Sequence, residues 1–355
     1  MLFRIARPLI HRTDPERAHR ATIAALAHLM PSDLPRYDQR LATRVGTLRF
    51  AHPLLLAAGF DKDARAAHRL GALGFAGGEV GTLTPLAQAG NPTPRLFRLI
   101  EDRAVINRMG FNNGGQGAAL HRLALLHARP RRAPVGINIG ANKDSADRIA
   151  DYASGVRAMA GVADWLTVNI SSPNTPGLRA LQDEGQLDAL LSAVSEAARE
   201  VKSPPIWLKI APDLDREGLE GVVRAAVDHG LDAIVVGNTT IQRPPLHSAD
   251  AGAGGGLSGA PLAPIARAAL IETLAVADGA IPIVAAGGIA SAADLWDRLA
   301  LGASVAQLYS ALVYAGPSLS RRIVRELCAM LDRAGVRDVA ALIGSREPAP
   351  QSKRD

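Results

Sequence analysis

The stretch TVNISSPNTPGLR, residues 167–179, indicates how this chain folds. It begins as an apolar strand that includes the preceding Trp165, and it then changes to small polar residues such as Ser172 and Asn174. A buried strand that runs into a stiff loop rich in hydroxyl and amide groups is typical of the catalytic end of a barrel strand. The same composition is also typical of a capped turn, so the other strand ends must decide.

From Pro53 onward the chain repeats one rhythm: a short apolar run, a polar end and a helical pattern. Eight candidate strands follow this rhythm: Pro53–Ala58, Gly77–Thr82, Val135–Gly140, Trp165–Ser171, Ile206–Ala211, Ala233–Asn238, Ile281–Ala286 and Ser304–Tyr309. Short strands that alternate with helical patterns indicate parallel βα units. Eight such units predict a closed (β/α)8 TIM barrel, an α/β fold, with an open doubly wound sheet as the alternative.

We divide the chain into three segments at residues 1–40, 41–335 and 336–355. The first predicts two amphipathic helices, the second of them starting at Asp14-Pro15-Glu16 with a cap, a proline and an acidic first turn. This N-terminal helical extension either lies on a membrane surface or packs on the protein body. The second segment is the barrel, with a hairpin inserted at Arg95–Met109. The third ends in a polar tail from Ser345, for which we expect disorder.

Composition narrows the range of functions. The formal charge of +6 and the pI of about 9.9 are compatible with nucleic acid, an anionic membrane or an anionic substrate as partner. The one cysteine, Cys328, lies in an apolar helical pattern and is predicted to be a core residue; with one cysteine no internal disulfide forms. The histidines are scattered, so we predict no metal site. No apolar run approaches the length that spans a bilayer.

Polar residues end nearly every predicted strand, where a barrel would gather them into one cavity. Lys62 follows the first strand, and Lys209 lies inside the apolar run WLKIA of the fifth. Because burying an ammonium group is costly without a partner, a functional role for Lys209 is favoured over a structural one.

Two glycine-rich stretches, residues 251–259 and 286–288, precede helices late in the chain. Free backbone N–H groups at helix starts bind phosphate, and the last loops of such barrels often do so. The sequence lacks the contexts of a Walker loop or a dinucleotide fingerprint. The expected ligand is therefore a mononucleotide such as a flavin, or a sugar phosphate.

The motifs AAGFDKD, GTLTP, NRMGFNN, GINIGANK, NISSPNTPGLR, LKIAPD, GNTT, GGLSG, AAGGI and QLYS, in this order over residues 46–335, resemble dihydroorotate dehydrogenases. DPERAH at Asp14–His19 resembles the membrane-associated, quinone-using class 2 branch. The resemblance implies an FMN barrel that oxidises (S)-dihydroorotate to orotate in pyrimidine synthesis and reduces a membrane quinone. It further implies a peripheral protein on the cytoplasmic face of the inner membrane, monomeric or weakly oligomeric, without a nucleic-acid partner.

The resemblance also assigns roles to individual residues. Ser172 corresponds to the catalytic base, where the class 1 branch has cysteine, and Thr175 and Phe111 to the proton exit route. The implied substrate contacts are Lys62, Asn107, Arg108, Met109, Gly110, Phe111, Asn169, Asn174, Asn238 and Thr239. The implied flavin contacts are Ala58, Gly59, Phe60, Asp61, Lys62, Thr82, Asn138, Asn169, Lys209, Gly237, Gly259, Gly288, Tyr309 and Ser310. Gly237 stands where the family often has threonine, so one side-chain contact to FMN is expected to be missing.

Two other functions remain open. The basic pI is compatible with a flavin barrel that reduces uridines in transfer RNA, although that chemistry uses a cysteine acid and a basic RNA-binding domain would be expected after the barrel. A non-catalytic barrel is the other alternative, against which Lys62, Ser172 and Lys209 argue together. Flavin absorption of the purified protein would eliminate the non-catalytic alternative.

Overall fold

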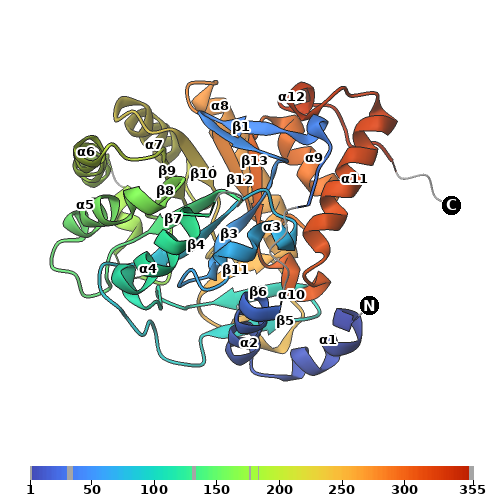
Figure 1. The fold of residues 1–355 in the computed structure, drawn as a ribbon, viewed down its shortest axis with the longest axis horizontal. Helices are drawn as coiled ribbons and strands as arrows, with labels where there is room; N and C mark the ends of the chain where they lie inside the picture. Colours follow the sequence, from blue (N-terminus) through green and yellow to red (C-terminus); the bar gives the residue numbers. More distant parts are fainter. Residues whose placement is uncertain (1, 30–34, 130–132, 176, 183, 352–355) are drawn as a thin grey trace.

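The computed structural model describes residues 2–29, 35–129, 133–175, 177–182 and 184–351. Its centre is a closed barrel of parallel strands, hydrogen-bonded in the order β10-β12-β13-β3-β4-β7-β8-β9 (Figure 1). The eight strands are β3 (Leu54–Asp61), β4 (Gly78–Leu83), β7 (Val135–Ile139), β8 (Trp165–Asn169), β9 (Ile206–Ile210), β10 (Ala233–Val236), β12 (Ile283–Ala286) and β13 (Val305–Leu308). The pairing of Ala306 in β13 with Leu54 in β3 closes the ring. The predicted (β/α)8 barrel is confirmed, and the open sheet is excluded.

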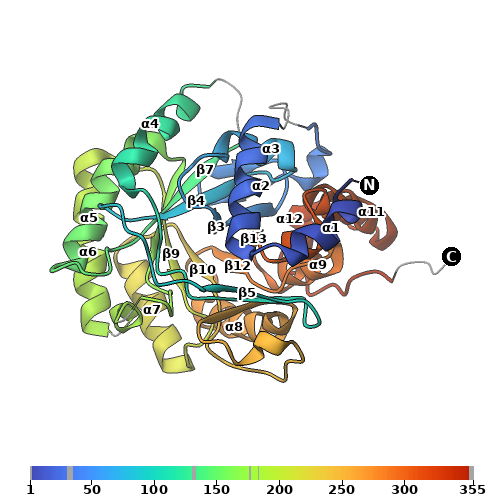
Figure 2. The same ribbon diagram turned by 90° about the horizontal axis from the view of Figure 1, so that it is seen from below.

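Helices surround the barrel, as the view from below shows (Figure 2). They are α3 (Leu70–Leu73), α4 (Gly115–His127), α5 (Arg148–Met159), α6 (Glu184–Val201), α7 (Arg216–Asp228), α8 (Ala263–Ala277), α9 (Ala292–Leu301), α10 (Ala311–Ala315), α11 (Leu319–Ala334) and α12 (Val339–Leu342). Helix α7 illustrates their construction: the Asp215 carboxylate caps it by accepting from Gly218 N at 2.9 Å, and Leu219, Val222 and Ala226 form its buried face.

One helical stretch in the described part of the chain, Ala260–Ala277, is long and apolar enough to cross a membrane by those two criteria alone. It coincides with α8 and the turn before it, and α8 packs against β10 and β12. The stretch therefore acts as a barrel helix in this structure.

The amino-terminal end of the barrel is closed by aromatic side chains. A hairpin of β1 (Thr43–Val45) and β2 (Leu48–Phe50) covers this end, and Phe50 packs edge-on against Trp165 with ring centroids 5.7 Å apart. Trp165 stacks on Trp207 at 4.7 Å, and both are fully buried. We call this apolar end the floor. The hairpin was not predicted, because strands of three residues carry too little alternation to be recognised.

The opposite end, which we call the mouth, carries a small antiparallel sheet. Its strands are β5 (Leu96–Leu99), β6 (Ala104–Asn107) and β11 (Gly256–Gly259), in the order β11-β6-β5. The hairpin predicted at Arg95–Met109 is thereby confirmed. Strand β11 was not predicted, because its sequence GLSG reads as part of a glycine-rich loop.

Helices α1 (Leu2–Arg12) and α2 (Pro15–Leu29) form the predicted extension and lie beside β5 and α10 at the mouth (Figure 1). Arg98 of β5 donates to Ile10 O at 2.6 Å, and the Arg95 guanidinium pairs with the Glu16 carboxylate at 2.8 Å. Ile23 is buried in the main core, whereas the side chain of Leu9 is 73% exposed. The pair is thus docked on the protein and still presents apolar surface.

Two expectations for the carboxyl-terminal part differ from the structure. The stretch from Ser345 to Gln351 is held in place, since Arg346 N donates to Ala300 O at 2.8 Å and Trp296 Nε1 donates to Glu347 O at 2.8 Å. The predicted disorder is therefore wrong for these residues, and residues 352–355 lie outside the described part. Cys328 is half-buried and donates to the Asp38 carboxylate at 3.3 Å, so α11 places it at the edge of the core rather than inside it.

Candidate active site

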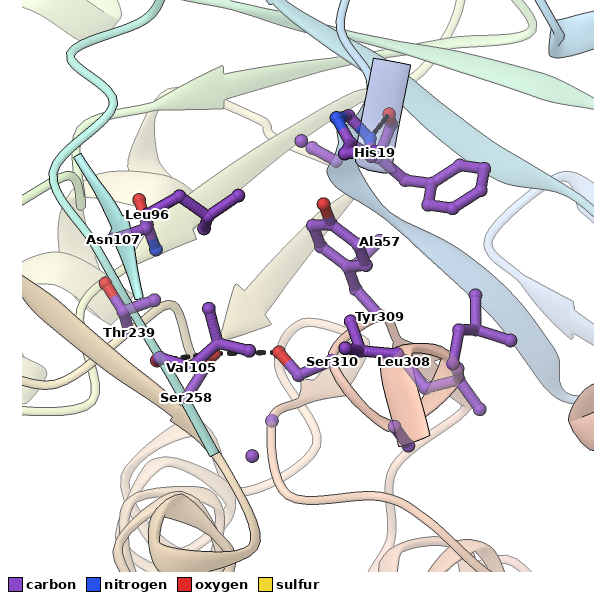
Figure 3. A pocket seen from close by; sticks show the side chains of 18 of the residues that line it. His19, Ala57, Leu96, Val105, Asn107, Thr239, Ser258, Leu308, Tyr309 and Ser310 are labelled. Carbon is purple, nitrogen blue, oxygen red and sulfur yellow. Dashed lines mark hydrogen bonds between the residues drawn. The ribbon is translucent and has the colours of Figure 1, made fainter. Parts of the chain in front are cut away.

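A cavity of about 660 Å³ lies at the mouth, between the strand ends, the β5–β6 hairpin and helices α1 and α2 (Figure 3). The structure brings most of the sequence-predicted site residues into its lining: Ala58, Gly59, Phe60, Lys62, Thr82, Asn107, Met109, Gly110, Phe111, Asn169, Ser172, Asn174, Lys209, Gly237, Asn238, Thr239, Gly259, Gly288, Tyr309 and Ser310. These residues come from β3, β4, the hairpin and the later strand ends, as shared barrel geometry requires.

Four predicted residues do not line this cavity. The Asp61 carboxylate turns back to accept from Arg65 N and Ala66 N, at 2.9 and 2.7 Å. The Arg108 guanidinium donates to Pro94 O at 2.8 Å and lies over the Phe97 ring. Asn138 and Thr175 are buried one layer behind the lining. The side chains of Asp61 and Arg108 therefore point away from this cavity, and their roles at the site stay predictions.

Amide and hydroxyl groups form a connected network under the cavity. Asn169 Nδ2 donates to both Thr82 Oγ1 and Asn138 Oδ1 at 3.0 Å, and Thr82 Oγ1 donates to Asn138 Oδ1 at 2.6 Å. Asn138 Nδ2 in turn donates to the Glu79 carboxylate at 2.9 Å. Each member orients the next, so the groups that face the cavity are fixed before any ligand binds.

Glu79 is a buried residue that the sequence analysis missed. Its carboxylate also accepts from Thr167 Oγ1 at 3.0 Å and from Gln307 Nε2 at 2.6 Å. Burial lowers the pKa of Lys209, and the negative charge of Glu79 acts in the opposite direction by favouring the ammonium. An acidic residue within the strand GEVGTL was the available signal, because a charge in a fully buried strand needs a partner.

The two lysines of the cavity lack hydrogen-bond acceptors. Within the described ranges neither Lys62 Nζ nor Lys209 Nζ donates to a protein group, although both line the cavity and Lys209 is only 5% exposed. Desolvation lowers the pKa of Lys62 to about 8, opposed by the nearby Glu16 carboxylate. Glu16 and Glu79 favour the two charged forms electrostatically but accept no hydrogen bond from them, so both ammonium groups are available to an anionic ligand.

The loop after β8 presents Ser172 to the cavity. Asn174 N donates to Ser172 Oγ at 3.2 Å, and Asn174 Nδ2 reaches Asn107 Oδ1 at 3.3 Å. Asn238 Nδ2 donates to Ser171 Oγ at 2.8 Å, which ties the β10 end to the same loop. Among the described residues, the buried Thr175 Oγ1 and Thr239 Oγ1 have no hydrogen-bond partner. Thr239 lines the cavity, so its hydroxyl is free to bind a ligand or water.

Two glycines on the other side of the cavity have backbone angles and neighbours that exclude a side chain. Gly259 has φ +99°, and a Cβ there would lie 2.5 Å from Arg103 O. Gly288 has φ +71°, and its Cβ would lie 2.2 Å from Ala263 Cα. Nearby, Ser258 Oγ and Ser310 Oγ are 2.7 Å apart (Figure 3). Exposed main chain, serine hydroxyls and Lys209 together fit a planar ligand that carries a phosphate.

Position 237, where threonine was expected from the resemblance, has no room for a side chain. Its φ is +120°, and a Cβ would lie 2.1 Å from Ala286 O. The expected loss of a side-chain contact is thus accompanied by a backbone conformation that favours glycine.

Toward helix α2 the cavity becomes aromatic and apolar. His19 Nε2 lies 2.7 Å from Phe60 O, and its ring contacts those of Phe60 and Tyr309. Desolvation lowers the pKa of His19 to about 4, so the imidazole is neutral at physiological pH and its Nε2–H donates to the carbonyl. His19 was noted only as part of DPERAH, and the sequence analysis did not place it in the site.

A closed barrel with a polar, lysine-containing cavity under an apolar entrance is the architecture of a cofactor-dependent barrel enzyme. The family model "Dihydroorotate dehydrogenase" matches residues 40–331. The chain belongs to the dihydroorotate dehydrogenase family, whose enzymes are flavoproteins.

Individual relatives agree with this assignment. A "Dihydroorotate dehydrogenase (quinone)" of Sphingopyxis alaskensis is 55% identical, with 97% of this chain and 96% of the relative covered. One of Erythrobacter litoralis is 53% identical, with 97% and 100% covered. The crystal structure of Eimeria tenella DHODH in complex with ferulenol superposes with a TM-score of 0.90 at 38% identity, covering 94% of this chain and 95% of that one.

Proposed function

We propose that this protein oxidises dihydroorotate to orotate, with FMN as the hydride acceptor and a membrane quinone as the final electron acceptor. The observation that carries the proposal is the pair of acceptor-free lysines, Lys62 and Lys209, facing one cavity with Ser172. Two separate cationic groups match two separate anionic ligands, a substrate carboxylate and a flavin nucleotide.

FMN would be held by the residues on the glycine-rich side of the cavity. Gly259 and Gly288 offer main chain to the phosphate, and Lys209 offers positive charge to the ring. When bound, FMN supplies an acceptor for a hydride from the substrate. The network of Thr82, Asn138 and Asn169 holds polar groups in place against the ring.

Dihydroorotate would occupy the space between Lys62 and the asparagines. Amide groups both donate and accept, which suits an imide-like ring, and Asn107, Asn174 and Asn238 all line the cavity. Lys62 supplies the charge for the carboxylate. Because Asn174 and Asn107 already contact each other, the substrate meets preorganised partners.

Ser172 Oγ acts as the base that removes the proton from C5 of the substrate. It accepts a hydrogen bond from Asn174 N, which directs the hydroxyl and leaves a lone pair for the proton. The unpartnered Thr175 Oγ1 behind it provides the next acceptor on the way to water. The single cysteine, Cys328, lies on α11 outside the cavity lining, so a cysteine acid of the kind used on transfer RNA is not available there.

The part of the cavity beneath α1 and α2 is apolar, and we call it the apolar arm. It would admit the quinone. The exposed side of the two helices would rest on the membrane. Phe3, Ile10, Ala18 and Leu26 line this arm, whereas Leu9 points to the outside. A single amphipathic anchor binds reversibly, which suits a peripheral protein on the cytoplasmic face of the membrane.

Anaerobic mixing of the purified yellow protein with dihydroorotate tests the first half of the proposal. We expect the flavin absorption to bleach, and full recovery of that absorption on adding a quinone. In a variant that lacks residues 1–40, dihydroorotate should still bleach the flavin absorption, but the absorption should recover slowly after quinone is added. A fully flavin-loaded protein that dihydroorotate cannot bleach would contradict the proposed substrate.

A further inference from the structure

Arg179 joins three loops of the mouth without lining the main cavity. Its Nε donates to Ser171 O at 3.1 Å, in the loop after β8. Its Nη1 donates to the Asp213 carboxylate at 2.9 Å, after β9, and its Nη2 donates to Thr239 O at 3.2 Å, after β10. A planar guanidinium can hold three acceptors in fixed directions, which an ammonium cannot.

Asp213 extends this junction. Its carboxylate also accepts from Thr240 Oγ1 and, at 3.4 Å, from Ile241 N. The side chains of Arg179 and Asp213 are 22% and 11% exposed, so the ion pair is largely shielded from solvent. Partial burial makes its geometry firmer than that of an exposed ion pair.

The acceptors of Arg179 are immediate neighbours of the groups proposed to do the chemistry. Ser171 precedes the base Ser172, and Thr239 is itself proposed to contact substrate beside Asn238. Asn238 Nδ2 bonds to Ser171 Oγ at 2.8 Å, so the same two loops are joined a second time on the cavity side. Arg179 thus fixes the main chain from outside while the amide fixes it from inside.

We propose that Arg179, held by Asp213, is a positioning residue that sets Ser172 relative to the substrate-binding β10 loop. It touches neither cofactor nor substrate and acts only through Ser171 and Thr239. The inference rests on the proposed function, because it predicts an effect on the dihydroorotate step alone. Small displacements of reacting groups are costly: about 1 Å can reduce a rate by about 10²-fold.

The test measures the two half-reactions separately in the full-length holoenzyme. Arg179→Ala should slow flavin bleaching by dihydroorotate by about 10²-fold and raise KM, since both loops shift. The bleaching rate of Arg179→Lys should lie between those of the wild type and Arg179→Ala, because lysine keeps the positive charge but lacks the planar guanidinium that holds three acceptors. Reoxidation by quinone should stay at the wild-type rate, since the apolar arm lies on the other side of the cavity.

Asp213→Asn supplies the second arm of the test. Its effect should be smaller than that of Arg179→Ala, and the double variant should be no slower than Arg179→Ala, because the two residues act as a unit. Arg157→Ala is the matched control, since it breaks the exposed Arg157–Glu200 pair far from the mouth. Flavin content and melting temperature are recorded for every variant.

The outcomes separate the two proposals. Failure of the wild-type holoenzyme to bleach with dihydroorotate would refute the proposed function itself. Normal bleaching in wild type and in Arg179→Ala would refute only the positioning role. Equal slowing of both half-reactions in Arg179→Lys would also refute it, because that result indicates general damage to the barrel.

Discussion

The two ends of this barrel differ in character: the floor is filled with apolar rings, whereas the mouth contains charged side chains. At the floor, Trp165, Trp207 and Phe50 fill the interior with stacked and edge-on rings. At the mouth, Lys62 and Lys209 line the cavity without a hydrogen-bond acceptor among the residues that the structure describes. Within the described residues the indole N–H groups of Trp165 and Trp207 also lack acceptors, but these two side chains are uncharged.

This difference indicates that the floor contributes to the stability of the fold and that the mouth carries the reactive groups. Buried apolar surface, including these rings, is the main favourable contribution to folding, whereas a desolvated ammonium opposes it. The mouth is therefore stabilised from elsewhere, by the floor and the helical shell. Substitutions at the two ends should separate rate from stability, and we order the following tests by expected size.

Ser172→Ala should give the largest effect and leave stability unchanged. A positioned base contributes about 10²–10⁴-fold, so flavin bleaching by dihydroorotate should slow by that factor. Stopped-flow absorption isolates this step from quinone reduction, and Ser172→Cys should recover part of the rate. Bleaching at the wild-type rate in fully flavin-loaded Ser172→Ala would assign the base to another residue.

Trp207→Ala should show the reverse behaviour at the floor. Removing a fully buried indole typically costs about 3–5 kcal/mol of unfolding free energy through lost burial and a cavity. Chemical denaturation measures this loss, while the bleaching rate of the protein that remains folded should change little. A large loss of bleaching rate without a loss of stability would mean that a change of structure at the floor alters the geometry of the mouth.

Lys62→Met should stabilise the protein while weakening substrate capture. The folded-state pKa of about 8 lies below the ordinary value of 10.5, so the charged form opposes folding. The gain should be roughly 1–3 kcal/mol near pH 7, from the usual equivalence of pKa shift and free energy. It should fade as pH rises from 8 toward 10.5, where the unfolded chain also loses the proton. Chemical denaturation at pH 7 and pH 10 would measure the gain in unfolding free energy. An equally large gain at both pH values would show that it does not arise from the lowered pKa of Lys62.

The smallest effect concerns pH and the free enzyme. A carboxylate substrate needs Lys62 protonated, so kcat/KM for dihydroorotate should fall above about pH 8, by about tenfold per unit once the group is deprotonated. Lys62→Arg should remove this alkaline limb because a guanidinium stays charged. The limb persisting unchanged in Lys62→Arg would assign it to another group.

The same comparison explains what could be predicted from the sequence. Eight strands were predicted, because each carries a short apolar run next to a helical pattern. The boundaries differ at polar ends: β3 continues to Asp61, three residues beyond the predicted Ala58, since its hydrogen bonds outlast its apolar run. Hairpin β1–β2 was missed because its strands of three residues are too short to show alternation. Strand β11 was missed because it pairs with the distant strand β6, which a local pattern does not encode.

Most of the cavity lining was predicted because barrel strands share one end. The side chains of Asp61 and Arg108 point away from the cavity, which could not be predicted because a motif gives a position along the chain and not the direction of a side chain. Glu79 and Arg179 were missed for a related reason. Their importance comes from partners distant in sequence, Gln307 for the one and Asp213 and Thr239 for the other.

The docking of α1 also has a consequence for the order of events during synthesis. His11 contacts Val313 O at 3.2 Å and Arg7 contacts Tyr314 O at 3.5 Å, across separations of 302 and 307 positions. A ribosome adding about 5–20 residues per second needs roughly 15–60 s to supply those partners. Throughout that interval α1 lacks these two partners, although Arg98 of β5, which donates to Ile10 O, is synthesised much earlier. Under the membrane role proposed above, the exposed apolar side of α1 is therefore available to a bilayer before α10 has been synthesised.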